Sequence, residues 1–133
     1  MKKDITQLPV ENVAVVISPR TGQASQELWD VYLVNQGNEP LSNVIISCRG
    51  YGELDGRDKT TTTLRYFFET VPAASSVLVE PIQPILFGIV NEYWVSFNQG
   101  DQMLDKKFVF AADSINAEAC GHVAILERIG VAA

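Results

Sequence analysis

The sequence predicts one antiparallel all-β domain: a sandwich of about seven strands, with a C-terminal strand or short helix added to it. Apolar and polar residues alternate in short segments along most of the chain. Turn-forming residues separate these segments at close spacing, and no repeat of fixed period favours a solenoid or propeller instead. A chain of 133 residues with 47% hydrophobic residues can bury a core as a single domain, residues 1–133.

The first four expected strands alternate in the way of a sheet with one buried face. Their expected ranges are 13–17, 28–35, 41–49 and, after four consecutive threonines, 64–68. The turn formers of 35–40 predict that the second and third strands form a hairpin with a longer loop. Segment 50–58, which is rich in glycine and acidic residues, is expected to be irregular. In the fourth strand Leu64, Tyr66 and Phe68 are expected to face inward.

Three more strands are expected at 77–82, 92–98 and 103–111. Pro81 and Pro84 lack a backbone donor, so the first of these strands should end early or lie at a sheet edge. Residues 83–90 form an apolar connection that we expect to be buried where it crosses the sandwich. In the next strand Tyr93, Val95 and Phe97 share the inward phase.

The two ends of the chain differ in pattern. Residues 1–9 are expected to form a flexible N-terminus, and residues 112–133 a C-terminal extension that packs on the sandwich. Within the extension, 121–129 has strand alternation but also fits helical spacing loosely, and we favour the strand.

Charge and chain composition exclude several classes of function. The net charge of −6 and the scattered basic residues disfavour nucleic acid and anionic membrane surfaces as partners. No apolar segment of a secretory signal precedes Pro9, and no run approaches the roughly 18 apolar residues of a membrane span. These observations predict a cytoplasmic protein.

The residues available for chemistry argue against an enzyme. The single histidine, His122, excludes copper and zinc sites that need several histidines, so no metal and no cofactor are expected. Cys48 and Cys120 are far apart in sequence and are expected to be reduced thiols; the alternatives are a single disulfide or a reactive thiol, the latter as a Cys–His dyad with His122. Three acids, Glu53, Asp55 and Asp58, are expected to lie in a solvated turn rather than to bind calcium.

A resemblance to a known fold appears in residues 29–44. Here a strand ends in Asn35-Gln36-Gly37, and Pro40-Leu41-Ser42-Asn43-Val44 opens the next strand. This segment resembles the strand–turn–strand of bacterial immunoglobulin-like and fibronectin-III-like domains. The resemblance implies an immunoglobulin-like β-sandwich and a role as an adhesion, spacer or binding module.

Aromatic residues on nominally polar strand faces are the candidate site. Tyr32, Phe67 and Trp94 should project outward, and Arg65 lies near Phe67 in sequence, so we predict an interaction patch of Tyr32, Arg65, Phe67 and Trp94. Alternatively, the 83–90 connection or the C-terminal segment covers these rings. The predicted function is a non-enzymatic protein-interaction or structural module that binds another protein or a second copy of itself. The alternative is a small-ligand or carbohydrate-binding domain that uses Trp94 and Tyr32.

Overall fold

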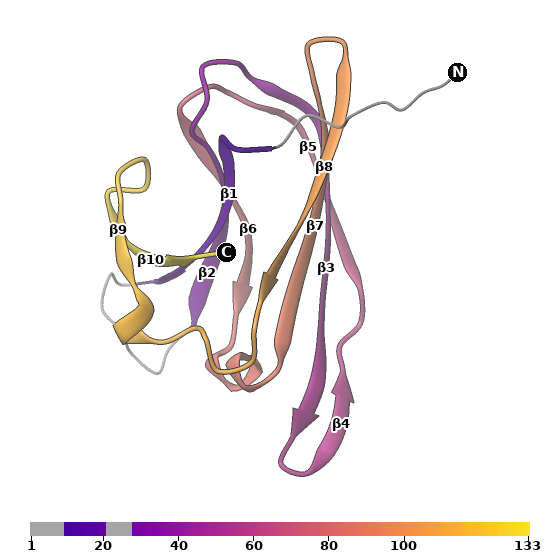
Figure 1. Cartoon of the computed structure of the whole chain (residues 1–133), viewed down its shortest axis with the longest axis vertical. Helices are drawn as coiled ribbons and strands as arrows, with labels where there is room; N and C mark the ends of the chain where they lie inside the picture. The colour runs from indigo at the N-terminus through magenta and orange to yellow at the C-terminus, as the bar shows by residue number, and fades with distance from the viewer. Residues whose placement is uncertain (1–9, 21–27) are drawn as a thin grey trace.

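The computed structural model describes residues 10–20 and 28–133, and this part of the chain is all-β (Figure 1). Two antiparallel sheets face each other, and the only helices described are two short 3-10 helices. The elements in chain order are β1 (Val13–Pro19), β2 (Trp29–Asn35), β3 (Leu41–Leu54), β4 (Arg57–Thr60), β5 (Leu64–Val71), β6 (Ser75–Ile82), η1 (Pro84–Gly88), β7 (Val90–Gln99), β8 (Gln102–Phe110), η2 (Ala117–Ala119), β9 (Gly121–Val123) and β10 (Arg128–Ala132).

The first sheet has the strand order β6-β2-β1-β10-β9. Its centre is the pairing of β1 with β2, which runs over seven residue pairs from Val13 opposite Asn35 to Pro19 opposite Trp29. β6 lies at the edge of this sheet, which confirms the position that Pro81 predicts. The C-terminal strand β10 adds to the other side of β1, where Val16 pairs with Ala132.

The second sheet has the order β4-β3-β7-β8, and β5 also pairs with β3. β3 is long enough to pair with β5 over its first part and with β4 over its last part. β7 and β8 form a hairpin whose register runs from Asn91 opposite Phe110 to Gln99 opposite Gln102. This sheet therefore presents one broad outer face made by β5, β3, β7 and β8.

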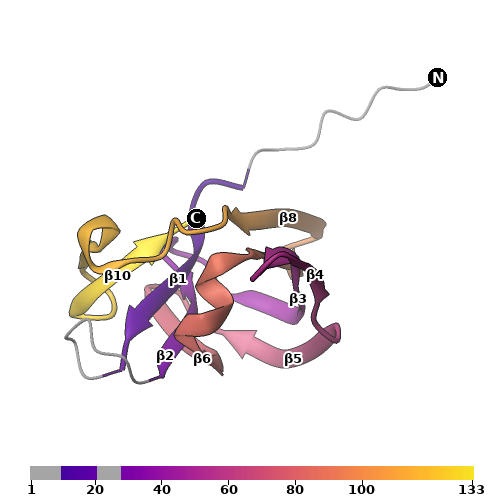
Figure 2. The ribbon, with the colours of Figure 1, turned by 90° about the horizontal axis from the view of Figure 1, so that it is seen from below.

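The core lies between the two sheets and contains the residues that alternation assigns to the inner faces. The predicted inward residues Tyr93, Val95 and Phe97 are fully or almost fully buried. η1 lies at the lower end of the molecule between the two sheets (Figure 2). There Phe87 meets the ring of Trp29 edge to face, with 5.2 Å between ring centroids.

The connection 83–90 runs from β6 in the first sheet to β7 in the second, and its burial is only partial. It was expected to be buried, and Phe87 and Ile89 are buried as expected, but Ile85 is exposed. The reason is the 3-10 geometry of η1, whose successive side chains point in different directions, so that Ile85 faces solvent while Phe87 faces the core.

Two expectations about strand pairing are wrong. β2 and β3 do not form a hairpin, because they belong to different sheets and the segment between them crosses the sandwich. Segment 50–58 is not irregular: β3 continues to Leu54 and pairs with β4 around the turn residues Asp55 and Gly56. Both turn residues have positive φ, 54° and 77°, which is the geometry that joins two strands with a two-residue loop.

Leu64 is a third correction, because it was expected to face inward and is exposed. It is the first residue of β5 and lines a cavity that opens to solvent between the sheets. Its neighbours in phase, Tyr66 and Phe68, do pack against the core and are half-buried.

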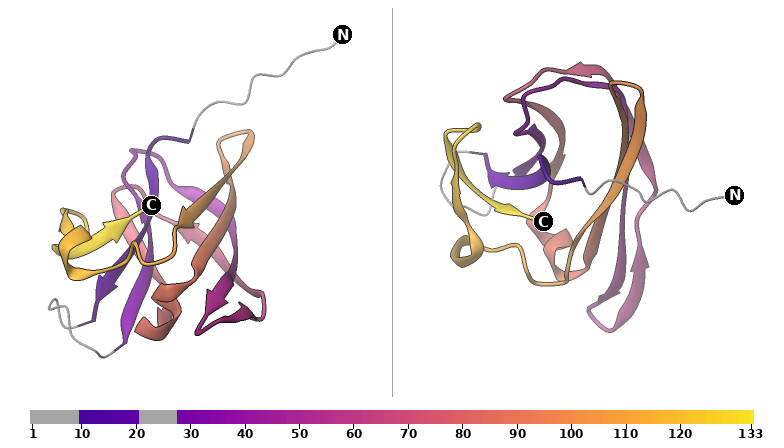
Figure 3. Two further views of the ribbon diagram at one scale, coloured as in Figure 1. Left: turned by 60° about the horizontal axis from the view of Figure 1, so that its bottom comes forward. Right: turned by 45° about the horizontal axis from the view of Figure 1, so that its top comes forward.

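The C-terminal segment forms a β-hairpin, β9 with β10, rather than a helix. One strand over 121–129 was the favoured prediction; the structure has strands at both ends of this range, but a turn at 124–127 separates them. The hairpin lies beside β1 on the far side from the second sheet (Figure 3). The flexible N-terminus expected at 1–9 lies outside the described residues. Among those described, no helix has the length and apolar character needed to cross a membrane.

Candidate interaction face and inter-sheet cavity

Three of the four predicted patch residues lie together on the outer face of the second sheet. Arg65 on β5 and Trp94 on β7 both pair with Ser47, which lies between them on β3. One step along the sheet, Phe67 pairs with Ile45. Arg65, Phe67 and Trp94 are therefore near neighbours on one surface, as the alternation of β5 and β7 predicts.

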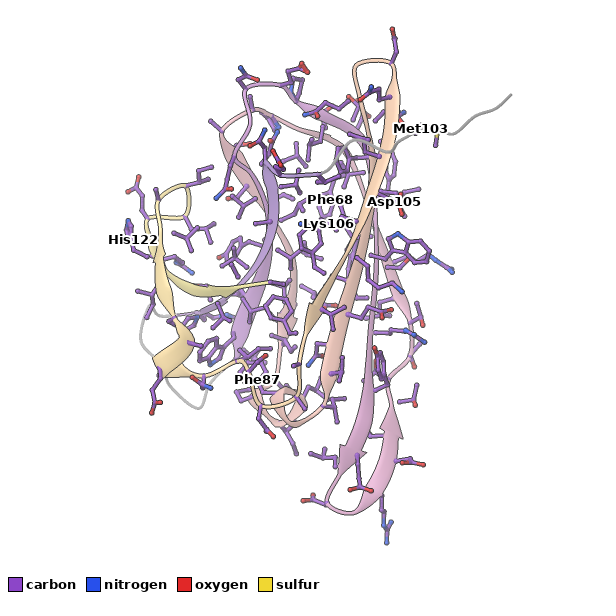
Figure 4. The ribbon with its side chains drawn as sticks, in the orientation of Figure 1. Phe68, Phe87, Met103, Asp105, Lys106 and His122 are labelled. Atoms are coloured by element: carbon purple, nitrogen blue, oxygen red, sulfur yellow. The ribbon has the colours of Figure 1, made fainter. Side chains whose placement is uncertain are left out.

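Two further apolar side chains extend this surface. Ile45 and Met103 are exposed together with Phe67 and Trp94, and the exposed fractions of Phe67, Trp94 and Met103 are 61%, 49% and 83%. Met103 and Asp105 project from β8 away from the first sheet (Figure 4). We call the exposed set Ile45, Phe67, Trp94 and Met103 the outer face. Exposed apolar side chains grouped in this way are typical of interaction surfaces.

Charged groups surround Trp94 and hold its ring in place. The indole Nε1 donates a hydrogen bond of 2.7 Å to the Asp105 carboxylate. The Lys107 ammonium lies 5.1 Å from the ring centroid, within the range of a cation–π contact. Lys107 also lies 3.8 Å from Glu92, which in turn pairs with Arg49 at 3.0 Å. Two shallow hollows adjoin Trp94, one reaching Met103 and the other reaching Arg65.

Tyr32, the fourth predicted residue, lies apart from the outer face because β2 belongs to the first sheet. Its hydroxyl accepts a hydrogen bond of 3.2 Å from Arg128 Nη1, and the guanidinium lies 5.8 Å from the ring centroid. The C-terminal segment therefore covers this ring, which is the alternative that the sequence left open. Since Trp94 and Tyr32 are on different sheets, they do not share one ligand platform.

The structure also contains a half-buried carboxylate that sequence reasoning missed, Glu80 on β6. In the β2–β6 register, Tyr32 pairs with Leu78 and Val31 pairs with Glu80, so Val79 is the extra residue of a β-bulge. A bulge shifts the phase of the strand by one residue. It turns Glu80 to the inner side, opposite the buried Val31, where strict alternation gives no reason to expect a carboxylate.

Glu80 joins the two sheets through tyrosine hydroxyl groups of the opposite sheet. Tyr66 Oη donates to one carboxylate oxygen at 2.9 Å, and Tyr93 Oη donates to the other at 3.1 Å. Desolvation raises the pKa of Glu80, and the two tyrosine hydrogen bonds oppose part of that rise. Burial and the nearby Glu80 raise the pKa of Tyr66 to about 12 and raise the pKa of Tyr93 further.

A cavity of about 190 Å³ opens beside Glu80, between the connection 61–64 and the end of β6. Its wall combines Glu80, Tyr93 and Asn91 with apolar groups such as Leu64, Ile82 and Leu86. Among the described residues, no lysine, arginine or histidine forms an ion pair with Glu80. The carboxylate is therefore partly desolvated without a cationic partner from this part of the chain.

The cysteines and the histidine do not converge. Cys48 is buried on the inner side of β3, and burial followed by the charge of Glu80 raises the pKa of its thiol, which therefore stays protonated at neutral pH. Cys120 and His122 lie at the C-terminal hairpin, and His122 points into solvent (Figure 4). Both thiols are free, and within the described ranges no cluster of three or more His, Cys, Asp or Glu residues is arranged to hold a metal ion.

Glu80 predicts a pH dependence of stability. Its pKa in the folded chain is raised above the ordinary value of 4.5, so the folded state holds this proton more tightly than the unfolded state. The resulting stabilisation is fully present below the ordinary pKa and is lost as the pH rises through the folded pKa. We therefore expect Glu80 to lower the free energy of unfolding as the pH rises from 4.5 through the pKa of Glu80 in the folded chain. Urea titration at a series of pH values measures this change.

The substitution Glu80→Gln should remove most of this pH slope, since glutamine does not titrate. Glu118→Gln, which changes an exposed carboxylate on η2, is the matched control and should keep the slope of the parent protein. An unchanged slope in Glu80→Gln would show that other groups cause the pH dependence.

Comparison with family models, with curated proteins and with solved structures finds no match to this chain.

Proposed function

We infer that the two sheets form an immunoglobulin-like sandwich. The strands of that fold are lettered in chain order: A, B and E share one sheet, and C, F and G share the other, which a strand C′ beside C can extend. The order β6-β2-β1 corresponds to E-B-A, and the order β5-β3-β7-β8 corresponds to C′-C-F-G. The buried Trp29 is on the second strand rather than the third, and the two cysteines are free, so the core differs from that of antibody domains.

We propose that the chain is a non-enzymatic protein-interaction module whose binding surface is the outer face. The observation that carries this proposal is the grouping of Ile45, Phe67, Trp94 and Met103 on one exposed side of a sheet. A sheet of this kind ordinarily hides apolar groups and presents polar ones to water. An aromatic centre with a charged rim is the composition of a protein interface.

The partner that we propose is a second copy of the chain. The rim carries both signs of charge: Arg65 and Lys107 lie at one level of the sheet, whereas Asp105 and Glu69 lie further along it. A two-fold axis places the same patch on both subunits, in opposite directions. The basic end of one face can then lie over the acidic end of the other, with the aromatic rings at the centre.

Other features of the molecule support a binding role over a catalytic one. The buried Cys48 thiol is kept protonated, so it is a poor nucleophile. The net charge of −6 gives no basic surface for phosphate groups. Apolar and aromatic groups offered by a rigid sheet are, in contrast, already arranged for association at little entropic cost.

The test is the mass of the protein in solution, measured by size exclusion with light scattering over a range of concentrations. We expect a dimer for the parent chain. The double variant Phe67→Ser, Trp94→Ser should raise the dimer dissociation constant by about thirtyfold or more, because central aromatic residues contribute most of the binding energy of an interface.

Ile85→Ser is the matched control, because Ile85 is equally exposed but lies on η1, away from the outer face. It should leave the dimer intact. Circular dichroism and thermal unfolding check that each variant keeps its fold. A parent chain that stays monomeric at the highest concentration, or a dimer that the double variant leaves unchanged, would contradict the proposal.

A further inference from the structure

The cavity beside Glu80 is suited to a very small ligand. Its volume of about 190 Å³ is below the roughly 300–1,000 Å³ of sites that hold drug-sized molecules. It lies where the edge strands of the two sheets separate, between the connection 61–64 and the end of β6. A ligand can therefore enter from solvent without a change in the strand pairing.

The cavity has a charged side and an apolar side. On the charged side each carboxylate oxygen of Glu80 accepts one tyrosine hydrogen bond and keeps further acceptor capacity. Asn91 uses its amide group to donate to the backbone oxygens of Leu86 and Ile89, which leaves its side-chain oxygen as another acceptor. The apolar side consists of aliphatic side chains: Leu64, Pro81, Ile82 and Leu86.

The cationic side chain that lines this cavity, Arg49, already pairs with another carboxylate. Arg49 contributes to the lining, but its Nε donates to Glu92 at 3.0 Å and its guanidinium lies 4.9 Å from the ring of Tyr51. The groups that do contact Glu80, Tyr66 and Tyr93, are neutral hydroxyls. A partly buried carboxylate is normally paired with a cation, and none is supplied by the described residues.

We propose that this cavity binds a small primary alkylammonium ion, with its charged head on the Glu80 carboxylate and its short chain against Leu64, Ile82 and Leu86. An ammonium head carries three donors and no acceptor, which suits a site built from acceptors. The alkyl chain gains from removal of its apolar surface from water.

Binding should depend on pH, because the ammonium ion pairs only with the ionised carboxyl group. Burial raises the pKa of Glu80, so binding strengthens as the pH rises through that value. Tyr66, Tyr93 and Cys48 face the same carboxylate, and their own raised pKa values keep them neutral over this range.

The experiment is a titration of the full chain with n-butylammonium chloride, followed by amide chemical shifts in two-dimensional NMR. Sodium chloride at equal ionic strength is the blank, and 1-butanol is the uncharged analogue of similar size. We expect saturable shifts at millimolar ammonium that map to 61–64 and 80–83. The alcohol should bind about tenfold more weakly or worse, because it lacks the charge.

Glu80→Gln should weaken butylammonium binding by about tenfold or more, and Glu118→Gln should leave it unchanged. If Glu80→Gln does not fold, lowering the pH of the parent protein below the folded pKa of Glu80 removes the same charge and should remove binding. Equal shifts from the alcohol and the ammonium ion, shifts that map outside the cavity, or the absence of saturable shifts would each overturn the proposal.

Discussion

Replacing Asn35 with alanine is expected to lower the free energy of unfolding by about 2–4 kcal/mol, because several buried hydrogen bonds are lost together. Asn35 is fully buried at the end of β2. Its amide nitrogen donates to the backbone oxygens of Glu39 at 2.9 Å and Pro72 at 3.0 Å, with a longer contact to Val71. Its side-chain oxygen accepts from Gly37 N at 3.0 Å.

This one side chain joins two connections that cross between the sheets. The segment after β2 leads to the second sheet, and the turn after β5 leads back to the first. Without the amide group, the carbonyl oxygen of the fully buried Val71 loses a donor in a place where water reaches it poorly, whereas Pro72 O still accepts from Ser75 Oγ at 2.7 Å. Chemical denaturation with urea measures the loss.

Asn38→Ala is the control, since Asn38 is exposed in the same loop. It should change stability by less than about 0.5 kcal/mol. Asn35→Asp keeps the acceptor for Gly37 but removes the donor, so it should be at least as damaging as alanine. If Asn35→Ala unfolds at the same urea concentration as Asn38→Ala, the hydrogen bonds of Asn35 contribute little to stability.

Alternation in the sequence identified which side chains face the core wherever a strand stays regular. Tyr93, Val95 and Phe97 lie inside as predicted, and Phe67 and Trp94 project outward by the same rule. The outer face could therefore be found in part from the sequence, because a strand with one buried face must place its other residues in solvent. The register of β7 with β8 places Met103 on the same surface as Trp94, and the sequence does not specify this register.

Features that depend on distant pairing could not be read in this way. The β-bulge at Val79 reverses the phase of β6 and brings Glu80 inside, yet nothing in the local sequence marks it. The turn residues after Asn35 suggest a hairpin equally well as a crossing between sheets. Tyr32 is covered by Arg128, which is 96 residues away in the chain.

The two sheets differ in whether their outer sides are covered by other parts of the chain. On the first sheet Val16 points away from the core and is nevertheless buried. The C-terminal hairpin lies against it: Ser18 Oγ donates to the backbone oxygen of Ile129 at 2.6 Å, Ala133 N donates to Val15 O at 3.1 Å, and Gly130 approaches Val16 Cγ1 closely. The second sheet has no such cover among the described residues, which is why its outer face is the one available for binding.

Gly130 is the residue that lets the hairpin approach β1, and Gly130→Val is expected to destabilise the protein by about 3 kcal/mol. A Cβ atom at this position would lie 2.5 Å from Val16 Cγ1 and 3.2 Å from the backbone oxygen of Ile17. Neither neighbour can move away easily, since both belong to the central strand β1. We expect β10 to separate from β1, so that amide hydrogen exchange accelerates at Val131 and Ala133 and urea unfolding shifts to lower concentration.

Gly121→Val provides a matched control on the same hairpin. Gly121 pairs directly with Gly130, but a Cβ atom added to it meets nothing within 4 Å. The substitution makes the same chemical change on the strand that does not contact β1, and it should leave stability and exchange close to those of the parent chain. Equal losses in the two variants would mean that valine weakens the hairpin itself. A loss confined to Gly130→Val instead locates the effect at the contact of β10 with Val16.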